Sequence, residues 1–398
     1  MSFDPSKAIN PTVANMPPSG IRKLFDIAAT MKDVVSLGIG EPDFITPWHI
    51  RNAGIASLEK GRTQYTANAG LATLKNEIAT YMKRRFNLSY DGPSQVLVTV
   101  GGSEAIDLCI RSLVSPGDEV IVPVPSFVCY GPIVSLAGGV PVYAELKAED
   151  QFRLTADTLK ACITEKTKML ILPFPNNPTG AVMRKEDLEE IAEVLRDTDI
   201  AVLSDEIYAE LTYGEARHIS IAEIDGMYDR TIIVSGFSKC YSMTGWRLGY
   251  ACGHPDIIKP MLKVHQYAVM CAPTTSQYAA IEALKNGDGD IEAMKKEYNY
   301  RRRFIVNGFN ELGMDCFEPL GAFYCFPSIE KVKPALEAKY DRKIDSDAFC
   351  ALLLEHAHVA LVPGTAFGEC GEGFLRVSYA YSIEHIREAL KRIKAFLT

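Results

Sequence analysis

The pattern of apolar and polar positions divides this chain into two regions. In the first, residues 95–255, short apolar runs alternate with stretches that have helical spacing of apolar residues. Seven short runs rich in β-branched residues have the length of buried strands, at 96–100, 119–122, 140–143, 168–172, 200–203, 231–234 and 248–252. After the first run, residues 103–114 place Ala105, Cys109 and Leu113 on one face of a predicted helix. This alternation predicts an α/β fold with a mostly parallel sheet.

The pattern changes after about residue 285. A long charged helix is predicted over 291–312, followed by strands near 322–325, 359–362 and 374–378 and by helices around 346–356 and 382–397. We therefore expect a large domain over residues 46–285 and a smaller α+β domain over 286–398. The N-terminal segment, 1–45, is expected to join the smaller domain, with a helix after residues 19–22. The two domains would enclose a cleft.

Composition narrows the class of protein. The chain has 398 residues, 47% of them hydrophobic and 23% charged, which is typical of a soluble globular protein. A net charge of -8 disfavours nucleic acid and anionic membranes as partners, because both select clustered Lys and Arg. Residues 1–6 lack the basic and apolar segments of a secretion signal, so we expect a cytoplasmic protein.

The ten cysteines indicate a reducing compartment. None forms a Cys-x-x-Cys pair, and none is spaced from a histidine as zinc ligands are. Most lie in apolar periodic stretches, where cysteine behaves as a small buried hydrophobic residue. We expect no metal site.

The segment 235–250 carries the most informative chemistry. Lys239 follows the strand-like run 231–234, so it is expected just past the carboxyl end of a strand, where open α/β sheets bind ligands. A lysine amine can form an imine with a carbonyl cofactor, and Arg247, eight residues later, can clamp a phosphate. Pyridoxal phosphate, a phosphorylated aldehyde, needs both groups.

Other polar residues follow neighbouring strand ends. Asp205, after the run 200–203, could hold a pyridine nitrogen protonated, and Tyr208 could bond the ring's 3-oxygen. Asn177 lies in a proline-rich turn after another run. Each also has a structural alternative: a helix cap for Asp205, core packing for Tyr208 and an Asx turn for Asn177.

Three further features suit a phosphorylated ring and an anionic substrate. Gly102 and Ser103 open a helix directly after a strand, which favours phosphate binding, although glycines there also serve simple turns. Phe127 could stack on a heteroaromatic ring or pack in the core. Arg376 lies inside an apolar strand, where a guanidinium needs an anionic partner such as a substrate carboxylate.

Read together, these motifs occur in the order typical of one family. The pairing of Lys239 with the segment 243–247, together with 177–180, 204–208 and 374–376, resembles the pyridoxal-phosphate-dependent class I aminotransferases of fold type I. The resemblance runs nearly end to end and is closest to the prokaryotic aromatic, aspartate and alanine aminotransferases. It implies a seven-stranded, mostly parallel sheet, pyridoxal 5'-phosphate as cofactor, and an enzyme of class EC 2.6.1.

The resemblance also implies roles for individual residues. The catalytic residues would be Lys239, Asp205 and Tyr208. Cofactor contacts would come from backbone groups of Gly102, Ser103 and Glu104, and from Phe127, Asn177, Asp205, Tyr208, Ser238, Lys239 and Arg247, with Tyr65 reaching in from a neighbouring subunit. Gly40, Asn177 and Arg376 would hold the amino acid's α-carboxylate. A homodimer follows if Tyr65 crosses over.

Substrate preference is the open part of this interpretation. Well-known aspartate enzymes carry an arginine for the side-chain carboxylate where this chain has the cation-free segment 266–276, which favours aromatic or broad specificity. We expect a ping-pong reaction with 2-oxoglutarate as the second substrate. Alternatives are an aspartate or alanine aminotransferase and, for another reaction type, a pyridoxal-phosphate-dependent β-lyase or decarboxylase. No Gly-x-Gly-x-x-Gly follows a strand, which disfavours a nicotinamide dehydrogenase.

Overall fold

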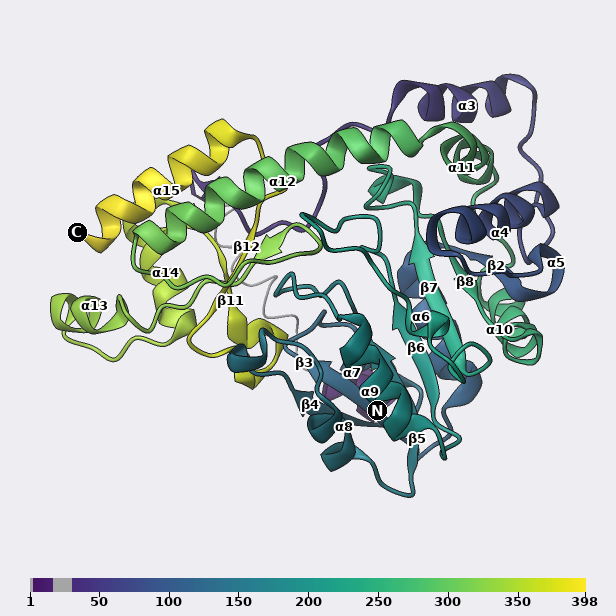
Figure 1. Ribbon diagram of the computed structural model, residues 1–398, viewed down its shortest axis with the longest axis horizontal. Coiled ribbons are helices and arrows are strands. Elements are labelled where there is room, and N and C mark those ends of the chain that lie inside the picture. The colour runs from purple at the N-terminus through teal and green to yellow at the C-terminus, as the bar shows by residue number, and fades with distance from the viewer. Residues whose placement is uncertain (1–2, 17–30) are drawn as a thin grey trace.

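The computed structural model describes residues 3–16 and 31–398. Figure 1 shows two parts joined along the long helix α12 (Asp288–Glu311): a larger part built around one sheet, and a smaller part holding the C-terminus. The helix expected after residues 19–22 lies outside the described residues.

One seven-stranded sheet forms the centre of the larger part. Its strands are β2 (Val96–Thr99), β3 (Glu119–Val124), β4 (Val140–Glu145), β5 (Thr167–Leu172), β6 (Ala201–Asp205), β7 (Thr231–Gly236) and β8 (Gly249–Cys252). They lie in the order β2-β8-β7-β6-β5-β3-β4, and β8 runs antiparallel to both of its neighbours. All seven predicted strands are therefore confirmed, as is the mostly parallel sheet. Except in the edge strand β4, their apolar runs are buried because helices cover both faces.

The larger part also contains helices, some of which connect these strands. They are α3 (Trp48–Glu59), α4 (Ala72–Phe86), α5 (Gly92–Gln95), α6 (Gly101–Leu113), α7 (Tyr130–Leu136), α8 (Ala156–Cys162), α9 (Lys185–Leu195), α10 (Pro255–Ala268) and α11 (Thr274–Asn286). The helix predicted at 103–114 is α6, which begins two residues earlier and buries Ala105 and Cys109 as expected. It packs against α10 and against strands β7 and β8.

The smaller part combines helices with short strands. Its helices after α12 are α13 (Lys333–Tyr340), α14 (Ser346–Ala357) and α15 (Ile383–Leu397). Strands β9 (Tyr324–Cys325), β11 (Val362–Pro363) and β12 (Leu375–Ser378) form an antiparallel sheet, while β1 (Val35–Ser36) pairs in parallel with β10 (Val359–Ala360). The strand predicted at 359–362 thus divides into two, because its halves pair with different partners on either side of Leu361.

Shorter elements complete the described chain. They are α1 (Pro11–Ala14) and the 3-10 turns Pro5–Ala8, Ala148–Asp150, Ile221–Glu223, Thr244–Trp246, Gly364–Phe367 and Glu369–Gly371. The pairing of β1 with β10 supports our proposal that the N-terminal segment, 1–45, joins the smaller domain, 286–398, but only at residues 35–36. Helix α1 instead contacts α7 of the large domain, 46–285.

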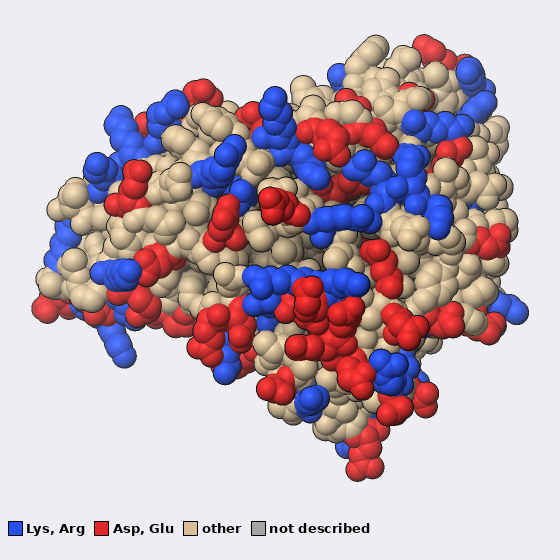
Figure 2. Space-filling view, in the orientation of Figure 1, with Lys and Arg blue, Asp and Glu red and all other residues tan. Residues whose placement is uncertain are grey.

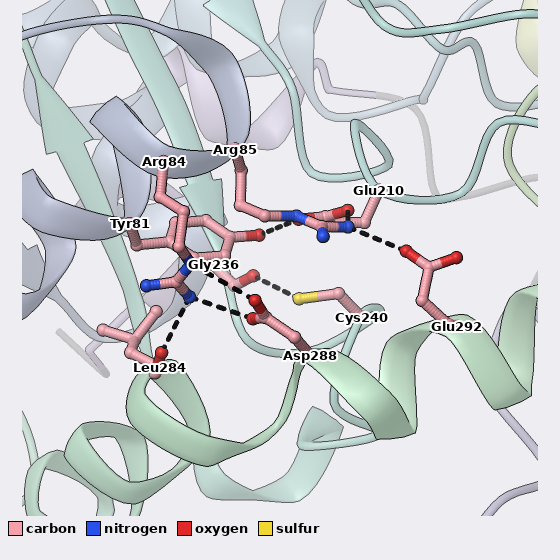
Figure 3. A network of polar contacts seen from close by, with 9 residues as sticks. All are labelled: Tyr81, Arg84, Arg85, Glu210, Gly236, Cys240, Leu284, Asp288 and Glu292. Atoms are coloured by element: carbon pink, nitrogen blue, oxygen red, sulfur yellow. Dashed lines mark hydrogen bonds and ion pairs between the residues drawn. The ribbon is translucent and has the colours of Figure 1, made fainter.

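A buried polar network fixes the turn that follows β6 (Figure 3). The Glu210 carboxylate accepts hydrogen bonds from the Tyr81 hydroxyl at 2.5 Å and from the Arg85 Nε and Nη2 atoms at 2.9 and 2.6 Å. Arg85 also pairs with Glu292 of α12 at 3.0 Å. Glu210 is buried, so these donors provide the hydrogen bonds that water would give to an exposed carboxylate. Helices α4 and α12 are thereby tied to the turn that carries Tyr208.

Candidate active site

A cavity of about 790 Å³ opens at the carboxyl ends of the central strands, where the two parts meet. The structure brings eleven of the thirteen predicted site residues to its wall: Gly40, Gly102, Ser103, Phe127, Asn177, Asp205, Tyr208, Ser238, Lys239, Arg247 and Arg376. They come from the N-terminal segment, from six regions of the large sheet's rim and from β12. Such a concave site with converging polar groups is typical of a small-molecule pocket.

Lys239 lies in the turn three residues after β7 ends. Its Nζ atom donates a hydrogen bond to the backbone oxygen of Gly40 at 2.8 Å, across the cavity from β7. Burial is the main cause that lowers the pKa of Lys239 to about 8; the nearby guanidiniums of Arg376 and Arg247 contribute to this lowering, and the charge of Glu41 opposes it. An amine with this pKa is partly neutral near pH 7, so it is available as a nucleophile or a base.

Asp205 is the last residue of β6 and faces the same cavity. Its carboxylate accepts hydrogen bonds from the Tyr130 hydroxyl at 2.7 Å and from the Ile207 backbone N–H at 3.2 Å. Burial raises the pKa of Asp205 to about 6, although these donors pull it down. A buried carboxylate with two donors attached suits one more partner, a protonated ring nitrogen.

Tyrosines complete the wall of the cavity. The hydroxyls of Tyr208 and Tyr324 lie 2.9 Å apart, and burial raises the pKa of Tyr208 well above its ordinary value. Tyr324 also fills the space beside Gly40, where an added Cβ would come within 2.1 Å of its hydroxyl. Sequence reasoning missed the contacts of Tyr130 and Tyr324. For Tyr130 the available signal was its position three residues after Phe127, since the rings of Phe127 and Tyr130 meet edge to face with centroids 6.1 Å apart.

The start of α6 forms a cradle suited to a phosphate. Gly101 has a left-handed φ of +79°, and an added Cβ there would lie 2.6 Å from the Arg247 Nη2 atom. Gly249 approaches equally closely, since its Cβ would lie 2.5 Å from the Gly101 carbonyl carbon. Only residues without side chains permit this packing. The first N–H groups of α6 and the Arg247 guanidinium therefore lie together, as an anion requires.

Arg376 is a buried cation with incomplete pairing. It is 3% exposed and donates from Nη1 to the Asn177 side chain at 3.1 Å and from Nη2 to the Gly38 carbonyl at 2.5 Å. Its Nε atom is buried without a partner, and within residues 3–16 and 31–398 no carboxylate pairs with it. The guanidinium lies 4.9 Å from the ring of Tyr324. A substrate carboxylate would supply the missing negative charge.

Two predicted residues lie away from the cavity wall. The Glu104 side chain turns back to accept from the Val100 N–H at 2.5 Å and to bond the His265 Nδ1 atom at 2.8 Å. Tyr65 is 80% exposed, and its loop is held to the α10–α11 connection by bonds from Asn68 to the Met270 carbonyl and from Thr274 to the Gln64 carbonyl. Its reach into a neighbouring subunit stays a prediction.

The described part of the chain shows no cluster of metal-binding side chains. It holds no grouping of three or more His, Cys, Asp or Glu side chains placed to bind a metal ion. All ten cysteines are free thiols. Within the described ranges, no helix combines the length and apolarity needed to span a membrane. On the face shown in Figure 2, positive and negative side chains are interspersed.

Comparisons with known proteins agree with one another. The family model "Aminotransferase class I and II" matches residues 32–393. An aspartate aminotransferase of Pyrococcus abyssi (strain GE5 / Orsay) is 46% identical over 382 residues, covering 96% of each chain. Aromatic-amino-acid aminotransferase 2 of Thermococcus litoralis is 41% identical over 382 residues, with 96% of each chain covered. The crystal structure of an aromatic aminotransferase from Pyrococcus horikoshii OT3 superimposes with a TM-score of 0.87 at 44% identity, covering 94% of this chain and 98% of that one.

Proposed function

The chain belongs to the class I and II aminotransferases, and from that membership we propose that it is an aminotransferase of aromatic-leaning or broad specificity whose amino acceptor is 2-oxoglutarate. It is an enzyme that moves an amino group between an amino acid and a 2-oxo acid, with pyridoxal 5'-phosphate as cofactor.

The residues present fit this cofactor. The glycine cradle with Arg247 and Ser238 would hold its phosphate, Asp205 its ring nitrogen, and Tyr208 with Asn177 its 3-oxygen. Phe127 would stack on the ring. When bound, the cofactor supplies an aldehyde that takes up the amino group and a ring that delocalises electrons from the substrate's α-carbon.

Lys239 is proposed as the residue that bonds to the cofactor's aldehyde and then carries the α-proton. Its lowered pKa allows the amine to be neutral when it accepts a proton and charged when it returns one. The Gly40 carbonyl holds the amine in the cavity through its 2.8 Å hydrogen bond. Lys239→Ala should abolish turnover, and near-normal turnover would refute the assignment.

Arg376 is proposed to orient the amino acid. Its unpaired Nε and its place between Asn177 and Gly38 leave a binding position for an α-carboxylate. When Arg376 holds the α-carboxylate, the amino acid can no longer change position freely in the cavity. Its α-hydrogen can then be directed toward Lys239. Such positional control contributes to the rate of proton transfer.

Substrate preference rests on one observation about charge. The cations on the cavity wall are Lys239, Arg247 and Arg376, and each has a role above, so none among these lining residues is free for a second carboxylate. The remaining wall includes apolar and aromatic side chains: Val34, Ile39, Ile106, Pro173, Pro175 and Tyr324. Aspartate stays the second candidate, because the Pyrococcus abyssi relative at 46% identity bears that name.

A panel of amino donors with 2-oxoglutarate tests the proposal. We expect tyrosine and phenylalanine to exceed aspartate in kcat/KM by about tenfold or more, the scale of a missing charge partner. Formation of one glutamate for each donor consumed distinguishes an aminotransferase from a β-lyase or a decarboxylase. A clear preference for aspartate would overturn the aromatic assignment.

We also propose a homodimer. Apolar side chains are exposed around the Tyr65 loop and the adjacent connection, including Tyr65 at 80%, Tyr267 at 88% and Met270 at 45%. Exposed apolar groups gathered in one region are typical of an interaction surface, and a second copy would cover them. Sedimentation velocity tests the dimer, and mixing Tyr65→Ala with Lys239→Ala subunits tests the crossing. The ten free thiols support our expectation of a reducing, cytoplasmic location.

A further inference from the structure

A second carboxylate lies directly behind Asp205. Glu206 follows it in the chain, and because successive side chains of an extended strand point to opposite faces, Glu206 points away from the cavity. Its backbone N–H continues the strand pairing by donating to the Val234 carbonyl at 2.8 Å. The two carboxyl groups are therefore held on either side of one rigid length of backbone.

The Glu206 carboxylate is fully enclosed by polar partners. It accepts hydrogen bonds from the Ser204 and Ser220 hydroxyls at 2.8 and 2.6 Å, and the His218 Nε2 atom lies 2.9 Å from its other oxygen. Glu206 is 2% exposed. Three side chains placed around one buried oxygen pair keep the carboxylate in a single position.

Beyond these three partners, the carboxylate has no contact with the described wall of the cavity that would explain its presence. Apolar side chains lie around the three polar partners: His218 meets the ring of Phe86 edge to face, and Leu172, Phe174 and Ile221 line the small space beside Ser204. A buried charge is costly there, and an apolar side chain would often serve stability as well. Glu206 does not line the cavity, so it touches neither substrate nor cofactor.

Its position gives it an effect on Asp205. Burial is the main cause of the raised pKa of Asp205, and the charge of Glu206 raises that pKa further. With almost no solvent contact, this charge is weakly screened. A more basic Asp205 holds a protonated partner more tightly.

We propose that Glu206, fixed by Ser204, Ser220 and His218, is a positioning residue that acts through Asp205 to strengthen the hold on the protonated ring nitrogen of the cofactor. The proposal rests on the role assigned to Asp205 above. Glu206 would place a second negatively charged carboxylate behind Asp205.

Affinity measurements on the cofactor-free protein separate this effect from a structural one. The probes are pyridoxal 5'-phosphate and its 1-deaza analogue, in which a C–H group replaces the ring nitrogen. Glu206→Gln keeps the size of the side chain and removes its charge. We expect about a five- to tenfold weaker affinity for pyridoxal 5'-phosphate, but less than a twofold change for the analogue. Equal losses for both probes, or no loss for either, would overturn the proposal.

Two further variants make the outcome specific. Glu210→Gln is the matched control, because Glu210 is an equally buried carboxylate four residues later, paired with Arg85 instead of standing behind Asp205. It should affect both probes equally. Asp205→Asn should lose affinity selectively for pyridoxal 5'-phosphate; if it does not, the role of Asp205 itself fails.

A milder variant covers the case in which Glu206→Gln does not fold, as judged by its thermal unfolding. Ser220→Ala removes one of the donors that stabilise the Glu206 anion. It should produce a selective loss in the same direction, of about twofold. If Asp205→Asn is selective while Ser220→Ala is not, Glu206 does not act through Asp205.

Discussion

The buried amine of Lys239 should make the cofactor-free protein less stable at neutral pH than at alkaline pH. Its pKa of about 8 lies below the ordinary lysine value of 10.5. A lowered pKa contributes stability that is present above pH 10.5 and is lost as the pH falls through 8. At about 1.4 kcal/mol for each pH unit between the two values, enclosing the charged amine costs about 3 kcal/mol at pH 7. Lys239→Met, which has no charge, removes this cost.

Urea unfolding of the cofactor-free proteins at several pH values measures the effect. The difference in unfolding free energy between Lys239→Met and the original chain should favour the variant more at pH 7 than at pH 9.5, by about 2 kcal/mol. Other titrating groups are common to both proteins, so they cancel in the difference. Lys75 is a useful comparison, because burial also lowers its pKa and its amine donates to the Pro93 carbonyl at 2.8 Å. Lys75→Met should behave with the same sign. A difference for Lys239→Met that stays constant across this range would refute the reasoning.

Three other substitutions test contacts described above. Tyr324→Phe removes the hydroxyl that bonds Tyr208, and losing a hydrogen bond of about 1 kcal/mol should lower kcat/KM about fivefold; unchanged kinetics would contradict it. Gly249→Ala forces a Cβ against the start of α6 and should lower the unfolding free energy by about 1–3 kcal/mol, while Gly245→Ala, which meets nothing within 4 Å, should leave it nearly unchanged. Arg85→Gln leaves the buried Glu210 without its main cation and should cost about 3–5 kcal/mol in urea unfolding. Arg84→Gln is the control, because Arg84 is exposed and pairs with Asp288 between the same two helices; it should lower the unfolding free energy by at most about 1 kcal/mol. Equal losses for the two variants would show that burial is not the cause.

Most strands of the large sheet were predictable because they are buried on both faces; the edge strand β4, which exposes Val140 and Tyr143, is the exception. Continuous apolar runs such as 231–234 have no other common origin in a chain of this composition. The short strands of the smaller part were harder, since β10 and β11 lie in one apolar run and differ only in their partners. Pairing between distant segments is a tertiary property, so local pattern cannot reveal where one strand stops and the next begins.

The site was predictable to the extent that it consists of strand ends. Asp205 and Lys239 follow apolar runs directly, and parallel strands bring their carboxyl ends to one edge. Contacts across the cavity were not predictable in this way. The bond between Tyr208 and Tyr324 joins residues 116 positions apart, and the enclosure of Glu206 by His218 depends on how a loop folds back.

The pairing of β6 with β7 holds the reacting groups in place independently of the segments that contact the substrate. Asp205 is opposite Val234 in the ladder, five residues before Lys239, so backbone hydrogen bonds of the sheet set the spacing between acid and amine. Gly40 and Tyr324 reach the cavity from segments outside that ladder. A library that randomises residues beside these two could alter which amino acid is accepted while the reacting groups keep their spacing. In this chain, the choice of substrate can therefore be changed from segments that lie outside the large sheet.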